Sequence, residues 1–414
     1  MQSFLRQLYS QILFPMGWLV GLFLTLFSKK IRQMYIDRSQ QIVPPANVVN
    51  KNAFWIHCSS GEFEYARSII KLIKQQNSET PVVVSYMSPS YKKVIASDDN
   101  VDFCFPLPWD FFVKQKELLK KINPKAVMVA RTDFWPQFLY CCKVLKIPTI
   151  AFSVRSTSEN ILEKLAQRFR LKEVQHVFCV GADDQLQLKD SGIIAIPLGD
   201  SRWDRVFERL SLKSKIEKRI ESPLPILIAG STWPKDENIL IDAISDNRLS
   251  DAVSTVIIPH EVDKAHLNQL TKTLTRKNLK FALYSQVEAW DGSSILVVDQ
   301  TGVLADFYRT ASAAFVGGSF DRSVHSVMEP IGAGVPVIVG PRHTKSREAL
   351  DFKRVKISDH LNVATEVNDR REFADTLLRI LKHDRNAIKK VILAEAQKNM
   401  GASSRILNQT KQLL

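Results

Sequence analysis

The segment that most constrains the fold runs from Ala313 to Pro341 and reads AAFVGGSFDRSVHSVMEPIGAGVPVIVGP. It predicts a buried strand at Ala313–Val316, a glycine-rich turn, a polar loop, a helix and a second apolar strand. A helix N-terminus flanked by glycines and small hydroxyls suits a phosphate, because its N–H groups and dipole attract an anion. Glu329, in the first turn of the expected helix, suits a ribose diol. The segment therefore predicts a nucleotide-sugar site on an α/β domain.

Apolar runs repeat the strand-and-helix pattern along the chain in two series. The first series of strands is expected at Ala53–His57, Pro81–Tyr86, Phe103–Leu107, Ala126–Ala130, Pro148–Ser153 and Val177–Val180. The second is expected at Pro225–Ala229, Val256–Pro259, Ser294–Val298, Ala313–Val316 and Val335–Val339. Continuous apolar runs are typical of parallel strands buried on both faces. Because 414 residues are many for a single core, we expect two doubly wound domains that face a cleft at the carboxyl ends of their strands.

The order of these segments predicts four parts of the chain. Residues 1–40 form an anchor or interfacial helix, residues 41–210 a first domain that binds the acceptor, and residues 211–385 a second domain that binds the nucleotide sugar. A charged helical stretch near 205–220 separates the two domains. Residues 386–414 are expected to form a C-terminal helix that braces the first domain.

Composition indicates the redox compartment of the protein and the chemical class of its partners. Five cysteines show neither a disulfide-framework spacing nor a CxxC pair, which favours a reducing compartment. The formal net charge of +14 attracts anions, whether nucleic acid, anionic lipid or a phosphorylated substrate. No nucleic-acid motif appears and the charge is scattered, so we expect no nucleic-acid partner.

The N-terminus indicates a membrane. Ile12–Phe27 is a run of 16 residues without a charge, and Lys29, Lys30 and Arg32 follow it. The run is slightly shorter than the roughly 17 residues that span a bilayer at minimum, although Trp18 and the basic cluster suit interfacial anchoring. The positive-inside rule would keep the rest of the chain in the cytoplasm. The alternative is a hydrophobic helix packed against the first domain.

Seven blocks in a fixed order resemble a known family. They are HCSSGEFE (57–64), TDFWP (132–136), GDSRWDRV (199–206), AGSTWPKDE (229–237), PHE (259–261), FVGGSF (315–320) and HSVMEP (325–330). Together they are similar to the Kdo transferases, which are GT-B glycosyltransferases of lipopolysaccharide synthesis. These enzymes move 3-deoxy-D-manno-octulosonate (Kdo) from CMP-Kdo onto a lipid A precursor. The resemblance implies inverting transfer to lipid IVA at the cytoplasmic side of the inner membrane.

The resemblance implies that Glu62 is the general base that deprotonates the acceptor hydroxyl. It follows a strand and a glycine-containing turn, where a base is needed; the alternative is that Glu62 caps its own helix. The implied donor site has phosphate-binding turns, a nucleotide-contacting histidine and a ribose acceptor. Its residues are Gly230, Ser231, Thr232, His260, Gly317, Gly318, Ser319, His325, Ser326, Met328 and Glu329. For His260 and His325 the alternative is a loop histidine without a ligand, and Met328 is expected to pack beneath the nucleotide.

The expected acceptor site comprises Ser60, Gly61, Arg131, Asp133 and Trp135, and it departs from the family pattern. The family block usually reads Glu-x-Glu-Leu-Trp-Pro, and here Arg131 replaces its first carboxylate. Arg131 could bind an acceptor phosphate or carboxylate in a bidentate manner, or pair with a neighbouring acid. This departure leaves open another GT-B transferase with a different donor and lipid-linked acceptor, or a silent membrane-bound scaffold.

We expect no metal or cofactor. CMP carries a single phosphate, which N–H groups and basic side chains can neutralise, and no His/Cys cluster has metal-ligand spacing. The sequence leaves open the number of Kdo units transferred, the acceptor's phosphorylation and acylation, and the oligomeric state.

Overall fold

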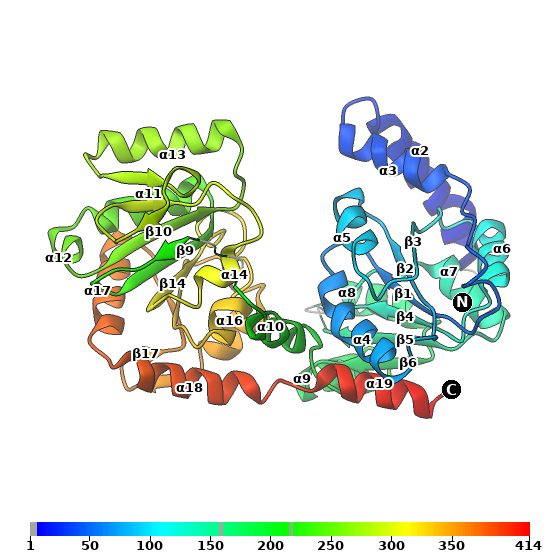
Figure 1. Ribbon diagram of the computed structural model, residues 1–414. Coiled ribbons are helices and arrows are strands. Elements are labelled where there is room, and N and C mark those ends of the chain that lie inside the picture. The colour runs from blue at the N-terminus through cyan, green and yellow to red at the C-terminus, as the bar shows by residue number, and fades with distance from the viewer. Residues whose placement is uncertain (1–5, 157–159, 215, 217) are drawn as a thin grey trace. The chain divides into compact units, whose positions relative to one another are not determined.

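The chain folds into two compact units in the computed structural model, which describes residues 6–156, 160–214, 216 and 218–414 (Figure 1). Unit 1 comprises the chain up to Arg205 together with Asn399–Leu414, and unit 2 comprises Val206–Lys398. The division falls within helix α10 (Arg202–Ser211), in the region where the sequence changes from one series of strands to the other.

Unit 1 is built on a seven-stranded parallel sheet of order β3-β2-β1-β4-β5-β6-β7. The strands are β1 (Phe54–Cys58), β2 (Val82–Tyr86), β3 (Phe103–Pro106), β4 (Ala126–Ala130), β5 (Thr149–Val154), β6 (His176–Cys179) and β7 (Ala195–Pro197). Apolar side chains fill a core on each face, with Trp55 and Val127 on one side and Ile56 and Met128 on the other. The helices include α4 (Phe63–Gln76), α6 (Phe112–Ile122), α7 (Pro136–Val144), α8 (Ile161–Leu171) and α9 (Ala182–Asp190).

The strand order of unit 1 reverses between β1 and β4, and this reversal locates its candidate site. In open parallel sheets, ligands bind beyond the carboxyl ends of the strands at such a switch point. Glu62 lies in the connection after β1, and Arg131 follows β4 directly. The topology alone therefore brings these two segments, almost 70 positions apart in the sequence, to one edge of the sheet.

Unit 2 repeats the architecture with a parallel sheet of order β11-β13-β10-β9-β14-β15-β18. The strands are β9 (Ile226–Thr232), β10 (Ser254–Pro259), β11 (Phe281–Leu283), β13 (Ile295–Val297), β14 (Ala313–Val316), β15 (Val337–Val339) and β18 (Ala364–Glu366). The helices include α11 (Pro234–Ile244), α13 (Lys264–Arg276), α15 (Met328–Gly332), α16 (Arg347–Phe352) and α17 (Arg370–Leu381). Here the switch point lies between β9 and β14, where Gly230–Thr232 and the Gly317–Ser319 turn end their strands.

One predicted turn in unit 2 is part of a strand. We expected strand β9 to end at Ala229, but it continues to Thr232 because Pro259 pairs with Thr232. The register shifts after Ile258, which pairs with Gly230, so Ser231 is the extra residue of a β-bulge. Ser231 has a φ of 54°, in the left-handed region that a non-glycine residue adopts at a cost. The bulge turns the strand end at the position where the sequence predicted a simple turn.

The N-terminal segment packs on unit 1 with one face only. A π-helical turn (Tyr9–Leu13) and α2 (Phe14–Leu24) precede α3 (Lys29–Ser39). Phe14 and Trp18 contact Phe111, with ring centroids 5.2 Å and 6.1 Å apart. Large apolar side chains on the remaining surface of this segment are exposed: Ile12, Leu13, Met16, Leu19, Val20, Leu22, Phe23, Leu24, Leu26 and Phe27. Arg6–Leu24 is long and apolar enough to cross a membrane, on length and composition alone.

The C-terminal segment forms two helices rather than the single helix expected. Helix α18 (Arg385–Gln397) belongs to unit 2, whereas α19 (Ala402–Gln412) belongs to unit 1 and packs on α4. Gly401 separates them because its φ of 82° cannot continue a helix. The carboxylate of Asp204 accepts hydrogen bonds from the N–H groups of Gly401 and Ser403, which ties the start of α19 to α10.

Candidate functional site

Glu62 is a half-buried carboxylate at the switch point of unit 1. It is the residue before α4, but its side chain caps none of the N–H groups of that helix. Its Oε2 instead accepts a hydrogen bond from the backbone N–H of Ser60, at 2.9 Å. This bond holds the carboxylate back over the β1–α4 connection, so the helix-capping interpretation does not describe its contacts.

Asp133 is partly exposed and pairs with a buried histidine that is not among the predicted site residues. Its Oδ2 lies 2.9 Å from Nε2 of His57, a residue of β1 whose side chain is fully buried. Nδ1 of the same ring is 2.8 Å from Oγ of Ser85 on β2. Burial raises the pKa of Asp133, but hydrogen bonds and charge interactions, of which those with His57 are the largest, together outweigh it and lower that pKa. Asp133 is therefore an anion held beside the end of β1.

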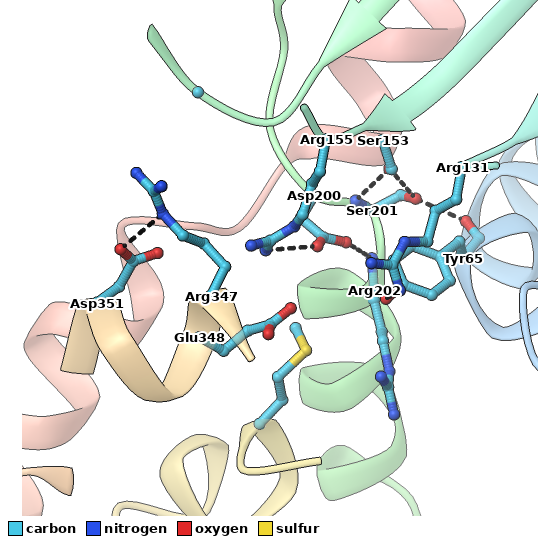
Figure 2. Close-up of polar contacts among 12 residues, drawn as sticks. Tyr65, Arg131, Ser153, Arg155, Asp200, Ser201, Arg202, Arg347, Glu348 and Asp351 are labelled. Atoms are coloured by element: carbon cyan, nitrogen blue, oxygen red, sulfur yellow. Dashed lines mark hydrogen bonds and ion pairs between the residues drawn. The ribbon is translucent and has the colours of Figure 1, made fainter. Parts of the chain in front are cut away.

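Arg131 lies in a strained backbone conformation, with a φ of 60°. Its Nη1 donates a hydrogen bond of 2.7 Å to the hydroxyl of Tyr65 on α4, and its guanidinium carbon is 4.9 Å from the centroid of the Tyr65 ring. Tyr65 is fixed in turn, because its carbonyl accepts the hydroxyl of Ser201, which lies 2.9 Å from the hydroxyl of Ser153 (Figure 2). The network fixes Arg131 relative to the helix that begins after Glu62.

The remaining acceptor-side candidates are Ser60, Gly61 and Trp135. Ser60 and Gly61 form the turn that orients the Glu62 carboxylate, and a Cβ at Gly61 would lie 3.7 Å from the Tyr91 hydroxyl. Trp135 precedes α7 and packs on the N-terminal segment, with its ring 6.2 Å from that of Phe14. Trp135 therefore has a structural contact whether or not it meets a substrate.

In unit 2, Asp236 already occupies the N–H groups of the glycine turn. Its carboxylate is buried and accepts hydrogen bonds from Gly318 at 2.7 Å, Phe320 at 3.0 Å and Trp233 at 2.9 Å. Burial raises the pKa of Asp236, and these three bonds counter that effect only in part. Because the N–H of Gly317 bonds to the carbonyl of Gly230, the turn has few N–H groups left for a phosphate. Its main role is to shape the site.

Two of the hydroxyls predicted for the donor are also used within the fold. Thr232 is buried and donates to Glu237, whose carboxylate also bonds His266 at 2.9 Å. Ser319 is buried as well; its hydroxyl donates to the carbonyl of Val316 and accepts the N–H of Gly340. The hydroxyl of Ser231 is partly exposed, and within the described residues it has no hydrogen-bond partner. Ser231 is therefore the hydroxyl best placed to bind a ligand.

His260 and His325 lie together in a stack with Trp233. The two imidazole rings are 4.2 Å apart and nearly parallel, at 16°, and Trp233 stacks on His260 at 5.0 Å. The indole N–H of Trp233 donates to Nε2 of His325 at 2.9 Å, so the ring proton of a neutral His325 is on Nδ1. Burial lowers the pKa of His325 to about 4, with a smaller contribution from His260. His325 is thus a neutral hydrogen-bond donor at pH 7.

The predicted phosphate-binding helix is short. Helix α15 has five residues, and Ser326 precedes it with its hydroxyl accepting the N–H of Met328. Met328 is buried, as expected of a packing residue, whereas Glu329 is partly exposed. A helix of little more than one turn supplies a weaker dipole than the sequence suggested.

Several residues that build both sites had escaped the sequence analysis. They are His57, Tyr65, Ser153, Asp200 and Ser201 in unit 1, and Trp233, Asp236, Glu237 and His266 in unit 2. Most lie within the sequence blocks that resemble the Kdo transferases, and this resemblance could have pointed to them. In the described part of the chain, no group of three or more His, Cys, Asp or Glu residues could hold a metal ion.

The two-unit architecture matches solved structures along most of the chain. The UDP-GlcNAc 2-epimerase of Neisseria meningitidis has a TM-score of 0.61 at 14% identity, covering 87% of this chain and all of that one. This likeness, with the two doubly wound sheets, defines a protein of the GT-B fold. The expected fold class is thus confirmed.

The sequence is also similar to a family of known enzymes. The family model described as 3-deoxy-D-manno-octulosonic-acid transferase (kdotransferase) matches residues 32–205. The 3-deoxy-D-manno-octulosonic acid transferase of Aquifex aeolicus is 27% identical over 328 residues, which are 77% of this chain and 85% of that protein. The enzyme of the same name from Chlamydia muridarum is 26% identical over 73% of this chain and 74% of its own length. These matches identify the chain as a relative of the Kdo transferases, and so as a glycosyltransferase.

Proposed function

We propose that the protein transfers Kdo from CMP-Kdo to a lipid A precursor of the lipid IVA type, with inversion and with Glu62 as the general base. The observation that carries the proposal is the half-buried Glu62 carboxylate at the switch point of unit 1, in a chain related to Kdo transferases. Glu62 lies where a ligand of such a sheet binds. The bond from Ser60 orients the carboxylate without neutralising its charge.

The proposed chemistry is a single displacement. Glu62 takes the proton of an acceptor hydroxyl, and the oxygen attacks the anomeric carbon of Kdo on the face opposite the phosphate. The bond from that carbon to the phosphate oxygen breaks, and CMP leaves with the electron pair. Attack from the opposite face inverts the configuration. General base catalysis of this kind contributes about 10²- to 10⁴-fold to the rate.

We propose that unit 2 holds CMP-Kdo at the end of β9 and around α15. Ser231 and Ser326 would donate to the phosphate, His325 would donate from Nδ1, and Glu329 would accept the ribose hydroxyls. His260 contacts both other rings of the stack and is exposed, so a nucleobase could stack on it. Gly230, Thr232, Gly317, Gly318 and Ser319 would shape this site rather than bind the phosphate themselves. We propose no metal, because hydroxyl and imidazole N–H groups can hydrogen-bond a single phosphate directly.

We also propose that the protein lies at the cytoplasmic face of the inner membrane. The exposed apolar side chains of α2 support an interfacial position, as does the packing of Phe14 and Trp18 on unit 1. A second exposed apolar patch lies at the start of α8, where Ile161, Leu162 and Leu165 are 68%, 74% and 55% exposed. Such side chains favour the lipid boundary over water.

The test is a transfer assay in detergent with CMP-Kdo and a tetraacylated disaccharide bisphosphate. Wild type should form product, and Glu62→Gln should lower kcat by about 10²- to 10⁴-fold without changing the affinity for CMP. Glu64→Gln is the matched control, because Glu64 pairs with Arg67 and Arg205 and should lie outside the chemistry. A folded wild type that binds CMP but forms no product would favour a silent scaffold or another acceptor.

A further inference from the structure

A small cavity in unit 1 is lined by three arginines. Arg131 follows β4, Arg155 follows β5, and Arg170 lies near the end of α8; together with Gln167 they surround a space of about 30 Å³. Among the described residues that line it there is no carboxylate. The cavity lies at the carboxyl ends of β4 and β5, on the edge where ligands of such a sheet bind.

Within the part of the chain that the structure describes, Arg131 has no acid among its hydrogen-bond partners. Its Nη1 bonds the neutral hydroxyl of Tyr65, and its buried Nε–H has no hydrogen-bond partner within the described residues. A buried donor without a partner loses its hydration and is costly unless a ligand or water supplies an acceptor. The positive φ of Arg131 adds a cost that is characteristic of functional positions.

A buried ion pair lies beside the cavity. Arg155 is 10% exposed and pairs with Asp200 at 3.2 Å. The same carboxylate accepts the backbone N–H of Arg202, whose guanidinium is 5.7 Å from the centroid of the Tyr65 ring (Figure 2). An anion entering the cavity would meet the guanidinium groups of the three arginines that line it.

We propose that this cavity, which we call the arginine pocket, binds a phosphate monoester. One arginine satisfies a carboxylate in a bidentate manner, whereas a phosphate has a charge near −2 and three free oxygens. The three guanidinium groups that line the cavity match the phosphate better than the carboxylate. The pocket is too small to enclose a sugar ring. Assigning the phosphate to the acceptor rests on the function proposed above, but phosphate binding itself does not.

The first experiment measures phosphate binding without any transfer reaction. Thermal unfolding of the full-length protein is followed with inorganic phosphate, and with sodium acetate at matched ionic strength. Phosphate should raise the unfolding temperature of wild type, and this rise should be lost in Arg131→Gln and Arg170→Gln. Arg168→Gln, an exposed arginine on the same helix that does not line the pocket, should behave as wild type. No rise with phosphate, an equal rise with acetate, or an unaltered rise in both variants would overturn the proposal.

The second experiment distinguishes acceptor phosphate from free phosphate. Wild type and Arg131→Gln are compared with a bisphosphorylated acceptor and with the same acceptor after phosphatase treatment. Wild type should have a KM at least about tenfold lower for the phosphorylated form, and the variant should lose this preference. An equal KM for both acceptors would restrict the pocket to free phosphate while the transfer function stands. Absence of transfer to either acceptor would instead contradict the proposed function.

Discussion

At the scale of single residues, the hydroxyls of the donor candidates separate into those that build the site and those that can bind. The hydroxyl of Ser319 donates to the carbonyl of Val316 and accepts the N–H of Gly340. The hydroxyl of Ser231, on the bulge of β9, has no such partner within the described residues. Ser231→Gly should therefore weaken CMP binding about tenfold or more, as loss of a hydrogen bond to a charged group does. Glycine suits the positive φ, so the variant should fold as wild type does.

The matched variant for that experiment is Ser319→Ala, with CMP binding measured by calorimetry and stability by urea unfolding. It should lower the free energy of unfolding by about 1–3 kcal/mol, because it leaves the buried N–H of Gly340 without its acceptor, and leave the CMP affinity of the folded protein unchanged. If Ser319→Ala weakened CMP binding and Ser231→Gly did not, the assignment of the two hydroxyls would be reversed.

A buried carboxylate predicts a pH dependence of stability. Asp110 is 1% exposed and accepts the N–H groups of Gln137 and Phe138 and the hydroxyl of Tyr9. Burial raises the pKa of Asp110 to about 6, although these bonds and Arg38 act against it. The folded state therefore binds this proton more tightly than the unfolded chain does. The contribution is fully present below about pH 4 and is lost as pH rises through about 6.

The free energy of unfolding of wild type relative to Asp110→Asn should thus fall between pH 4 and 7, by at most about 3 kcal/mol. Urea unfolding at several pH values measures this difference. Asp99→Asn, at an exposed position, should show a difference that does not change with pH. A pH-independent difference for Asp110→Asn would show that Asp110 titrates as an ordinary carboxylate.

At the scale of elements, helix α2 divides its apolar side chains between two environments. Phe14 and Trp18 pack on unit 1, whereas Leu19 and Phe23 are 57% and 59% exposed. Replacing both Leu19 and Phe23 by glutamate should lower binding to anionic phospholipid vesicles at least about tenfold, since each buried side chain contributes about 1.5–3 kcal/mol. Stability in detergent should not change.

Cosedimentation with vesicles measures that binding, with Met400→Glu as the control. Met400 is 41% exposed and lies between α18 and α19, so a charge there should leave vesicle binding intact. Undiminished binding of the double variant would mean that α2 is not the element that meets the lipid.

At the scale of the whole molecule, the chain returns to unit 1 after completing unit 2. Leu407 of α19 is fully buried in the core beneath α4. Leu407→Ala should lower the stability of unit 1 by about 2–5 kcal/mol. Hydrogen exchange should become faster in α4 and β1 while the strands of unit 2 keep their protection. Faster exchange in unit 2 alone would contradict the division of the chain described here.

Much of the fold was predictable because parallel strands need continuous apolar runs. The strands at Ala126–Ala130 and Ala313–Val316 have the predicted bounds, and the GT-B class and the relation to Kdo transferases are confirmed. The predicted bounds were wrong where strand pairing or a backbone conformation changed the end of an element. Pairing with β10 carried β9 through Gly230, and the positive φ of Gly401 divided the C-terminal helix.

The sequence by itself determined the two sheets, their apolar cores and the segments that end at each switch point. Continuous apolar runs that alternate with helical segments are enough to predict buried parallel strands. Only the tertiary structure decided what each polar side chain does there. Asp236 bonds to a turn 82 positions away, and Arg131 bonds to Tyr65 across 66. Hydrogen bonds are short-ranged and directional, so such partners are set by how strands and helices pack, and no local pattern encodes them.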